Sequence, residues 1–504
     1  MRNPGDLHEC RLDAGIGRKS RHRVNCPAER SVGIASSSPI LARESGDFVR
    51  NGRTRPTKNS AALHLEAHRR DLHRCLSTTT GCVKVLVISN FYPPHTIGGY
   101  ELACAQVVTW LVSMGRDVTV LTQRGVPSSS VPGLALLRRL FFSFLEGDWS
   151  RATFKRHLLR QLAFDLWNYF ALRLVVSRFK PDLIFVFNPL GLGGLLLEWL
   201  HRPRNRPIVV HDIADEMLLH AYEYDAWFLL SNLEVRTPFK RLVRDAIVRI
   251  GGWFLPSEPR PLALSRSYFR SQFLKDRFIA AGQREAAGAP VIYNGIELSS
   301  DPPDEAEATG RGREIAILFV GRLCREKGLH VLLRALATVR CEAAHLKLSV
   351  AGASTDAAYR EELEALIANL SGRCQVTMLG QISPSDVRRL LRTHAIFAFP
   401  VIWDEPFGIS LLEAMDAAIP IVATATGGSR EFLRHEENCL VVKRGDPESL
   451  ADGLERLLNN PILCRQLGRN AKATVRSFAA QASFDRIGRH LQTVAELNNC
   501  VRCQ

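Results

Sequence analysis

The alternation of short apolar runs with helical patterns limits the fold of this chain more than any other feature. One series of apolar runs begins at Val83 and a second begins at Ile315. Strands that alternate with helices form a parallel sheet covered by helices on both faces. The sequence therefore predicts two doubly wound α/β domains in tandem. The expected strands are Val85–Ile88, Val118–Leu121, Leu183–Phe187 and Ile208–Val210 in the first domain, and Ile315–Val320, Leu346–Val350, Val376–Leu379, Ile396–Phe399 and Ile421–Ala423 in the second.

Changes in composition predict the domain boundaries. Residues 1–82 are basic and show neither a helical nor an alternating apolar period, so this extension is expected to be disordered, or not made if translation starts near Val83. Residues 83–297 form the first domain. The Asp-, Pro- and Gly-rich residues 298–312 predict a linker, and residues 313–478 form the second domain. We expect residues 479–504 to be a helix and tail that cross back to the first domain.

Charge and cysteine content bear on partners and location. The net charge of +15 favours anionic partners such as nucleotide phosphates, lipid pyrophosphates or a membrane surface. Basic residues are not interleaved with aromatic ones as in nucleic-acid modules, so no specific nucleic-acid partner is expected. The 12 scattered cysteines indicate reduced thiols of a cytoplasmic protein. No D-x-D triplet or His/Cys/Asp grouping has metal-ligand spacing, so neither a metal nor a cofactor is predicted.

Glu405 and Glu413 bracket the most informative motif, Glu-Pro-Phe-Gly-Ile-Ser-Leu-Leu-Glu. The apolar residues 395–400 before it predict a buried strand, and residues 411–418 predict a helix. Amides at the start of that helix would bind an anion, and the two carboxylates would accept hydrogen bonds from hydroxyl groups. The motif therefore predicts a site for a ligand with phosphates and hydroxyls. The alternative is a solvated Glu before an ordinary helix start.

A second charged motif, with Arg322 and Lys327, follows the first strand of the second domain. Arg has a planar fork of donors and Lys a mobile point charge, so together they can neutralise a diphosphate from two sides. A solvated loop is the alternative.

Three weaker motifs lie in the first domain. Gly98-Gly99 opens its first helix, where glycines let the backbone approach a ligand closely, although a simple turn would also explain them. The pattern is not G-x-G-x-x-G, so a nicotinamide cofactor lacks its fingerprint. His211 and Asp212 end the strand Pro207–Val210, where open α/β sheets bind ligands, but a structural His is equally consistent. Asn294-Gly295 predicts a turn.

Two apolar segments raise the question of membrane contact. Residues 183–200 are divided by Asn188, Pro189 and Glu198, which favours a strand, loop and helix over a spanning helix. Arg236–Ile250 predicts an amphipathic helix with a cationic face. Such a helix can dock on a membrane surface near a lipid-linked substrate. An ordinary packed helix with solvated arginines explains it equally well.

Taken together, the residues from Val83 to about residue 495 resemble the retaining, nucleotide-sugar-dependent glycosyltransferases of family 4, also called group 1. These enzymes have the GT-B fold of two Rossmann-like domains. The specific part of the resemblance is the Glu pair with its Pro-Phe-Gly interior together with the Arg/Lys loop. The looser motifs are Gly98-Gly99, Asn294-Gly295-Ile296, Leu379-Gly380 and Gly427-Gly428 with Glu431.

The resemblance implies a catalytic role for four residues. Arg322 and Lys327 would hold the donor diphosphate and stabilise the departing charge. Glu405 would accept hydrogen bonds from the sugar, and His211 would contact the same sugar. The residues implied in donor binding are Gly98, Gly99, Gly321, Gly380, Ile382, Phe407, Gly408, Ile409 and Glu413. Among these, Glu413 would bind the ribose, and Gly380 and Ile382 would lie along the base.

The resemblance also implies transfer with retention to a glycan, lipid-linked or small-molecule acceptor, without a metal. A nucleotide-sugar epimerase of the same fold and an inactive nucleotide-sugar-binding protein are the alternatives. The sequence departs from the family pattern at Ala418, where the family usually has Gly, which raises a question about helix packing. It also departs at Tyr100, which is bulkier than usual and concerns the shape of the acceptor site.

Overall fold

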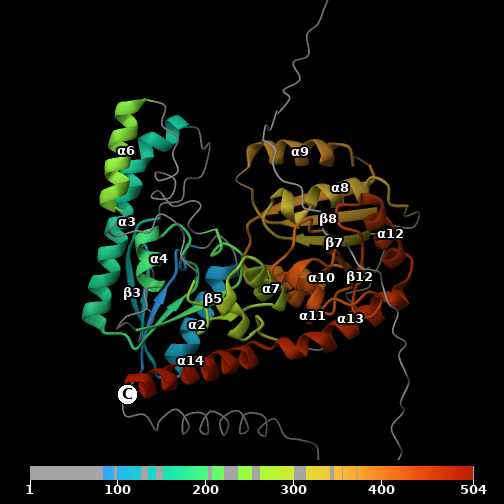
Figure 1. The fold of residues 1–504 in the computed structure, drawn as a ribbon. Coiled ribbons are helices and arrows are strands. Elements are labelled where there is room, and N and C mark those ends of the chain that lie inside the picture. The colour runs from blue at the N-terminus through green and yellow to red at the C-terminus, as the bar shows by residue number, and fades with distance from the viewer. Residues whose placement is uncertain are drawn as a thin grey trace, which may run out of the picture. The chain divides into compact units, whose positions relative to one another are not determined.

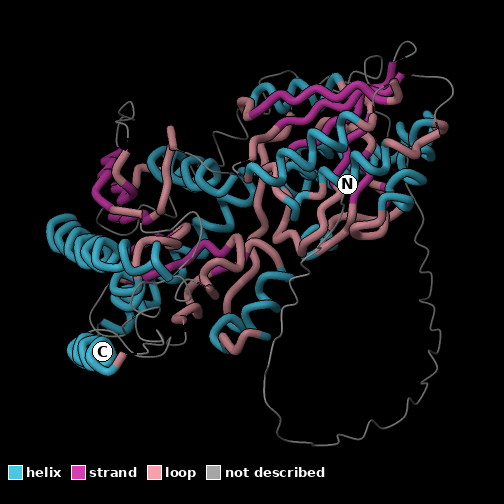
Figure 2. The backbone as a smooth tube through the Cα atoms, turned by 90° about the horizontal axis from the view of Figure 1, so that it is seen from above, coloured by secondary structure: helices cyan, strands magenta, loops and turns pink. Residues whose placement is uncertain are grey.

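The computed structural model describes residues 83–95, 99–125, 134–142, 151–201, 207–220, 237–251, 262–299, 314–340, 345–354, 356–370 and 372–502. The extension of residues 1–82, residue Gly98 and nearly all of the predicted linker lie outside these ranges. The described residues form two six-stranded parallel sheets (Figure 1). Each sheet has helices on its faces, which Figure 2 shows in cyan around the magenta strands. The predicted pair of doubly wound domains is confirmed.

The first sheet has the strand order β3-β2-β1-β4-β5-β6. Its order reverses between β1 and β4, which is the switch point where such sheets bind ligands beyond the strand carboxyl ends. The strands are β1 (Lys84–Ile88), β2 (Asp117–Gln123), β3 (Leu134–Leu140), β4 (Leu183–Val186), β5 (Ile208–Ile213) and β6 (Tyr268–Phe269), and the helices are α2 (Gly99–Ser113), α3 (Arg151–Phe179), α4 (Gly194–His201), α6 (Pro238–Gly251) and α7 (Gln272–Ala280), followed by the short 3₁₀ helix η1 (Arg284–Gly288).

The second sheet repeats this plan, with the order β12-β11-β10-β7-β8-β9 and its switch point between β7 and β10. Its strands are β7 (Glu314–Val320), β8 (His345–Ala351), β9 (Cys374–Gly380), β10 (Ile396–Phe399), β11 (Ile421–Ala423) and β12 (Leu440–Val441), and its helices are α8 (Leu329–Leu336), α9 (Ala357–Ala368), α10 (Pro384–Thr393), α11 (Ile409–Asp416), α12 (Pro447–Leu458) and α13 (Pro461–Val475), with the 3₁₀ helices η2 (Arg325–Lys327), η3 (Gly427–Glu431) and η4 (Arg476–Phe478).

Apolar side chains that alternate between the two faces of the strands explain why helices cover both faces of the second sheet. Successive strand side chains point to opposite faces. In β7, Ile317 and Phe319 belong to one buried cluster with residues of α8, α9 and α12, whereas Leu318 belongs to another with residues of α11 and α13. A continuous apolar run is therefore needed to fill two cores, as a buried parallel strand requires.

The last helix, α14 (Ala480–Arg502), packs on the first domain, and Figure 1 draws it in red, ending at the label C. Its residues Ile487, Leu491 and Val494 are part of the buried cluster that also contains strands β1, β2 and β4. The chain just before α14 pairs with the end of the first domain through a bridge between Ile296 and Ala479. The C-terminal segment therefore completes a core that begins about 400 residues earlier.

The turn predicted at Asn294-Gly295 is wrong. These residues belong to no turn and lead into the bridge at Ile296. A Cβ atom on Gly295 would lie 2.6 Å from the Cα of Ala480. The glycine is needed for close packing of two chain segments, which its sequence neighbours alone do not reveal.

No helix within the described ranges is both long and apolar enough to cross a membrane. The strand–loop–helix prediction for residues 183–200 is confirmed by β4 and α4, and the amphipathic segment forms helix α6.

Candidate active site

Glycines bring the loops of the second domain into contact at the carboxyl ends of its strands. Gly328, after β7, has a φ of +73°, and a Cβ there would lie 1.9 Å from the carbonyl oxygen of Pro400. Gly427, after β11, has a φ of +53°, and its Cβ would lie 2.3 Å from the carbonyl oxygen of Glu405. Any larger residue would need both an unfavourable backbone conformation and a clash. The loops after β7, β10 and β11 thus meet around Glu405.

Lys327 and Glu405, predicted as catalytic residues, form an ion pair. The Lys327 Nζ lies 2.5 Å from Glu405 Oε2, and both side chains are largely buried. The indole Nε1 of Trp403 donates a 3.0 Å hydrogen bond to the same oxygen. Within the described part of the chain, Glu405 Oε1 accepts no hydrogen bond, although the residue is only 8% exposed. One oxygen of this carboxylate is therefore held by the protein and the other is left for a ligand.

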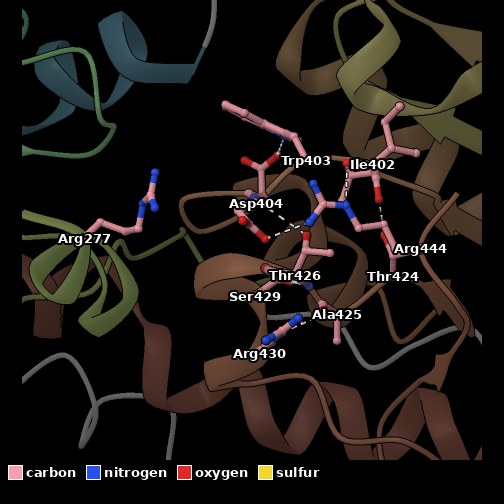
Figure 3. A network of polar contacts seen from close by, with 12 residues as sticks. Arg277, Ile402, Trp403, Asp404, Thr424, Ala425, Thr426, Ser429, Arg430 and Arg444 are labelled. Carbon is pink, nitrogen blue, oxygen red and sulfur yellow. Dashed lines mark hydrogen bonds and ion pairs between the residues drawn. The ribbon is translucent and has the colours of Figure 1, made fainter. Parts of the chain in front are cut away.

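The backbone of the Glu405 loop is held by polar contacts from the next loop, which Figure 3 shows in close-up. Thr424 Oγ1 donates to the carbonyl of Val401 at 2.6 Å, and Gly428 N donates to the carbonyl of Glu405 at 2.8 Å. Arg444 pairs with Asp404 at 3.0 Å. These contacts fix the path of the loop, so that Glu405 points toward Lys327 whereas Asp404 points toward Arg444.

Helix α11 begins at Ile409, four residues after Glu405, and its N-terminus has no side-chain cap. Its N-cap residue, Gly408, has a φ of +92° and no side chain to satisfy the first amides. The ring of Phe407 is buried and stacks on Tyr293 with a centroid distance of 5.7 Å. Phe407 therefore anchors the loop, while the amides of Gly408 and Ile409 stay available. An uncapped helix start of this kind attracts an anion through its free N–H groups and its dipole.

Glu413 lies one turn into α11, where burial raises its pKa from 4.5 to about 7, while the charge of Arg388 acts to lower it. No hydrogen bond to its carboxylate occurs among the described residues. A half-buried carboxyl group that accepts no hydrogen bond from the described residues is well suited to bind ligand hydroxyls, and such perturbed groups gather at functional sites.

Arg322 is exposed in the loop after β7, and its guanidinium forms no ion pair within the described ranges. Together with Lys327 it lowers the pKa of Glu326, although the Glu326 backbone amide contributes more. Gly321 lies against Gly352 of the next loop, since a Cβ on Gly352 would lie 1.8 Å from the Gly321 carbonyl oxygen. The predicted phosphate loop is therefore compact. Within the described residues, Lys327 and Arg325 each form an ion pair and Arg322 forms none.

Gly380 and Ile382 flank the end of β9. Gly380 is exposed with a φ of +68°, and Ile382 is half-buried in the loop before α10. They lie on the β9 side of the switch point, at the same edge of the sheet as the phosphate loop.

His211 does not lie beyond the end of its strand as predicted, because β5 extends to Ile213. Its ring is 1% exposed and stacks on His201 with centroids 5.1 Å apart, and neither ring nitrogen has a hydrogen-bond partner among the described residues. Burial and the neighbouring His201 hold the pKa of His211 well below its usual range. The imidazole is therefore neutral at physiological pH and can bind a ligand hydroxyl, but it cannot supply a positive charge.

The first domain encloses a charged pair next to His211. Arg270 Nε donates to Asp212 Oδ1 at 2.8 Å, and Tyr268 donates to Asp212 Oδ2 at 2.6 Å. The hydroxyl of Tyr100 contacts the backbone carbonyls of Phe187 and Asp212. The bulk of Tyr100 is thus explained by bonds that join α2 to strands β4 and β5. Gly99, beside it, faces the second domain: a Cβ there would lie 3.5 Å from Ile409 Cδ1.

Two residues at these sites escaped the sequence interpretation. Trp403 is in the loop before Glu405, and Arg270 follows the two-residue strand β6. A Trp two positions before a Glu in a loop has no periodic signal, and a short strand has too few residues to show one.

Comparisons with known proteins identify the family of the chain. The family described as "Glycosyl transferases group 1" matches residues 303–474. An uncharacterized glycosyltransferase of Methanocaldococcus jannaschii is 26% identical over 416 residues, which cover 78% of this chain and 93% of that protein. A D-rhamnosyltransferase of Pseudomonas aeruginosa is 30% identical over 400 residues, covering 78% of this chain and 91% of its own length.

Solved structures show the same fold. Sucrose-phosphate synthase from Thermosynechococcus elongatus superposes with a TM-score of 0.60 at 20% identity, covering 82% of this chain and 99% of that one. Anabaena HepE, solved with UDP and glucose, gives 0.54 at 19% identity, with 82% and 100% covered. The fold is GT-B. The chain belongs to the group 1 family of glycosyltransferases, and the resemblance inferred from the sequence is confirmed.

Proposed function

We propose that this glycosyltransferase is a retaining enzyme of the family 4 type, which moves a sugar from a nucleotide-sugar donor onto a hydroxyl group. The observation that carries the proposal is the Lys327–Glu405 pair beside the uncapped start of α11. One cation, one half-free carboxylate and a row of amides provide complementary partners for a diphosphate joined to a sugar. An epimerase or an inactive binding protein would bind the same donor but would not transfer its sugar.

The charges would act on the leaving group. When the bond between the anomeric carbon and the diphosphate oxygen breaks, its electrons stay on the diphosphate. Arg322 and Lys327 would stabilise that growing negative charge. Such stabilisation by positioned charges is usually the largest single contribution to an enzyme's rate enhancement. The departing phosphate would take the acceptor proton as the new bond forms on the same face of the sugar. Glu405 Oε1 would accept hydrogen bonds from the sugar.

The places of the other predicted residues in the fold suggest the remaining contacts with the nucleotide-sugar donor. Amides of Phe407, Gly408 and Ile409 would cradle the sugar and distal phosphate, and Glu413 would bind the ribose. Gly321, Gly380 and Ile382 would border the nucleotide. From the first domain, Gly99 would approach the diphosphate and neutral His211 would contact the sugar. Gly98, also predicted to bind the donor, lies outside the described residues. No metal is proposed, because Arg322 and Lys327 supply positive charge where the diphosphate would lie.

Names of relatives suggest the kind of acceptor. A phosphatidyl-myo-inositol mannosyltransferase of Mycobacterium leprae is 30% identical over 218 residues, although the match covers only 42% of this chain and 56% of that protein. With the D-rhamnosyltransferase, it supports a role in surface polysaccharide or glycolipid synthesis. We therefore propose a glycan or lipid-linked acceptor and a cytoplasmic enzyme that contacts the inner membrane face.

Helices α3 and α6 are the proposed membrane contact. On α3, Leu166, Trp167 and Phe170 are each at least 49% exposed, and on α6 Leu242 is 68% exposed among basic residues. Apolar side chains on a cationic helix favour an anionic bilayer. Sedimentation with vesicles containing anionic lipid should remove the wild type from solution at low salt, and Phe170→Glu should weaken this. Equal binding to neutral vesicles would argue against the assignment.

A donor panel tests the central proposal. Thermal shift and hydrolysis should be measured with UDP-glucose, UDP-galactose, UDP-N-acetylglucosamine and GDP-mannose, with and without EDTA. We expect one of them to raise the melting temperature and to be hydrolysed slowly, equally well with EDTA. NMR of the first-formed product should show the anomeric configuration of the donor. Binding without hydrolysis or transfer would favour an inactive binding protein, and a changed free nucleotide sugar would favour an epimerase.

A further inference from the structure

Trp403 makes contact with both members of the Lys327–Glu405 pair. Its indole N–H donates to Glu405 Oε2 at 3.0 Å, and Lys327 Nζ lies 5.4 Å from the centre of its ring. Since Lys327 Nζ is also 2.5 Å from Glu405 Oε2, each of the three side chains touches the other two. A cation within about 6 Å of an indole ring is attracted to it. The ring thus holds the lysine while its N–H holds the carboxylate.

The backbone does not provide this orientation. Ile402 is tied to the neighbouring loop by its N–H, which donates to the Glu326 carbonyl at 2.8 Å, and the Glu405 N–H lies 3.5 Å from Thr426 Oγ1. These bonds place the main chain but leave the rotation of the Glu405 carboxylate open. Within the described part of the chain, only Lys327 and Trp403 donate to that carboxylate.

We propose that Trp403 is a positioning residue for the transfer reaction, a role that rests on the proposed function. Its N–H keeps Oε2 of Glu405 turned inward and Oε1 toward the donor sugar. Its ring keeps Lys327 beside the diphosphate position. When a diphosphate binds, Lys327 turns from Glu405 to the ligand, and the indole N–H remains as the donor to Oε2. The buried carboxylate is then never left without a partner, which a protein interior strongly disfavours.

The two halves of the indole can be separated by substitution. Trp403→Phe keeps a ring for Lys327 but removes the N–H, and Trp403→Leu removes both. Trp110→Phe is the control for loss of an indole elsewhere, because Trp110 lies on helix α2 and stacks on Phe484 of α14 with a centroid distance of 5.7 Å. Circular dichroism and melting temperature should first show that each variant is folded.

The direct test is NMR of protein labelled with ¹⁵N-tryptophan, which has seven indole signals. The signal absent from Trp403→Phe should move in Glu405→Gln, move in Lys327→Ala, and move again when inorganic pyrophosphate or UDP is added to the wild type. The Trp110 signal, identified by its absence from Trp110→Phe, should not move in any of these cases. An unmoved Trp403 signal in Glu405→Gln would overturn the proposal, whatever the enzyme's activity.

Kinetics then test the consequence, using hydrolysis of the nucleotide sugar selected by the donor panel. We expect Trp403→Phe to lower kcat about tenfold with KM changed less than about twofold, because the cation remains in place. Trp403→Leu should lower kcat further and raise KM several-fold. Normal kcat in Trp403→Phe would refute the positioning role. A wild type that neither binds nor hydrolyses any nucleotide sugar would refute the proposed function instead, while the indole signals still decide whether the three side chains act together.

Discussion

The two domains have the same strand order and the same switch point, yet their charged residues do opposite things. In the first domain, Arg270 and Asp212 are both about 3% exposed and satisfy each other. In the second, Arg322 is exposed and unpaired within the described ranges, and Lys327 shares a carboxylate that keeps one free oxygen. The comparison teaches that the Rossmann scaffold sets where a ligand can lie, whereas the loops determine whether the charges there serve stability or binding.

The largest effect is expected in the first domain. Arg270→Leu would leave Asp212 as a buried charge without its partner, at a cost of about 3–5 kcal/mol in the free energy of unfolding. Urea denaturation followed by circular dichroism would measure it. Arg277→Leu is the control, because its pair with Glu216 is exposed at the arginine and should contribute no more than about 1 kcal/mol. If the two variants lost similar amounts of unfolding free energy, the buried Arg270–Asp212 pair would contribute no more to stability than the exposed pair.

The next effect concerns the second domain. Lys327→Ala or Arg322→Ala should each lower turnover at least about a hundredfold, or about 2–4 kcal/mol of barrier, because each removes a cation from the departing diphosphate. Both variants should remain folded, which circular dichroism would show. Arg325→Ala is the control in the same loop, since Arg325 pairs with Glu362 of α9. Near-normal turnover in Lys327→Ala or Arg322→Ala would contradict the assigned role.

Glu413 should make nucleotide binding depend on pH. Because ribose hydroxyls are best bound by the ionised carboxylate and the pKa is about 7, the affinity for the selected nucleotide should rise about tenfold between pH 6 and pH 8. Titration calorimetry at the two values would test this, and the rise should vanish in Glu413→Gln. The neutral His211 should contribute no such dependence in this range.

The Glu413 carboxyl group should also make the free energy of unfolding depend on pH. This free energy should fall as pH rises, whereas the nucleotide affinity should rise. The folded pKa of Glu413 lies above the ordinary 4.5, so the native state binds the proton more tightly and the free energy of unfolding falls as pH rises from 4.5 through 7. At pH 8, Glu413→Gln should therefore be more stable than the wild type by up to about 3 kcal/mol, because each unit of raised pKa corresponds to about 1.4 kcal/mol. If the wild type and Glu413→Gln had the same free energy of unfolding at pH 8 as well as at pH 5, the raised pKa of Glu413 would be contradicted.

The smallest effect is expected at Ala418. Its φ is +54°, a left-handed conformation that costs a residue with a side chain about 1–2 kcal/mol. Glycine avoids this cost but loses more conformational entropy on folding, so the gain from a substitution to glycine is smaller. Ala418→Gly should raise stability by about 0.5–1 kcal/mol. The neighbouring Ala417 has a φ of −71°, so Ala417→Gly should lower it by a similar amount. Differential scanning fluorimetry should show a higher melting temperature for Ala418→Gly and a lower one for Ala417→Gly. A lower melting temperature for Ala418→Gly would show that the backbone at Ala418 is not strained.

The departure at Ala418 shows how far sequence reasoning reached. The missing glycine raised a question about helix packing, and the structure identifies the cause as a left-handed residue just after α11. Most predicted strands were found within a few residues of their expected ends, because buried parallel strands are continuous apolar runs. Strand β3, Leu134–Leu140, was missed because its half-buried edge position mixes arginines with leucines.

The candidate site was predicted in part. Lys327 and Glu405 were assigned to one site from their residue types and their places after strands, and the structure brings them together. The roles of all the predicted site residues, Lys327 and Glu405 included, stay predictions. His211 was expected beyond its strand and lies within it. Trp403 was not noticed, because a hydrogen bond between a loop indole and a carboxylate two residues away depends on the exact path of the loop.

Apolar periodicity, helix signals and the kinds of charged residue are local properties, so the chain order alone predicted two α/β domains, which the structure confirms. It also predicted a site for a ligand with phosphates and hydroxyls, which stays a prediction. The meeting of Lys327 with Glu405 is different, because 78 positions separate them and only the pairing of β7 with β10 closes that distance. Contacts of that kind arise when a sheet buries both faces of its strands at once. Folding in three dimensions therefore selected which charges are paired, which oxygen stays free and which tryptophan holds them.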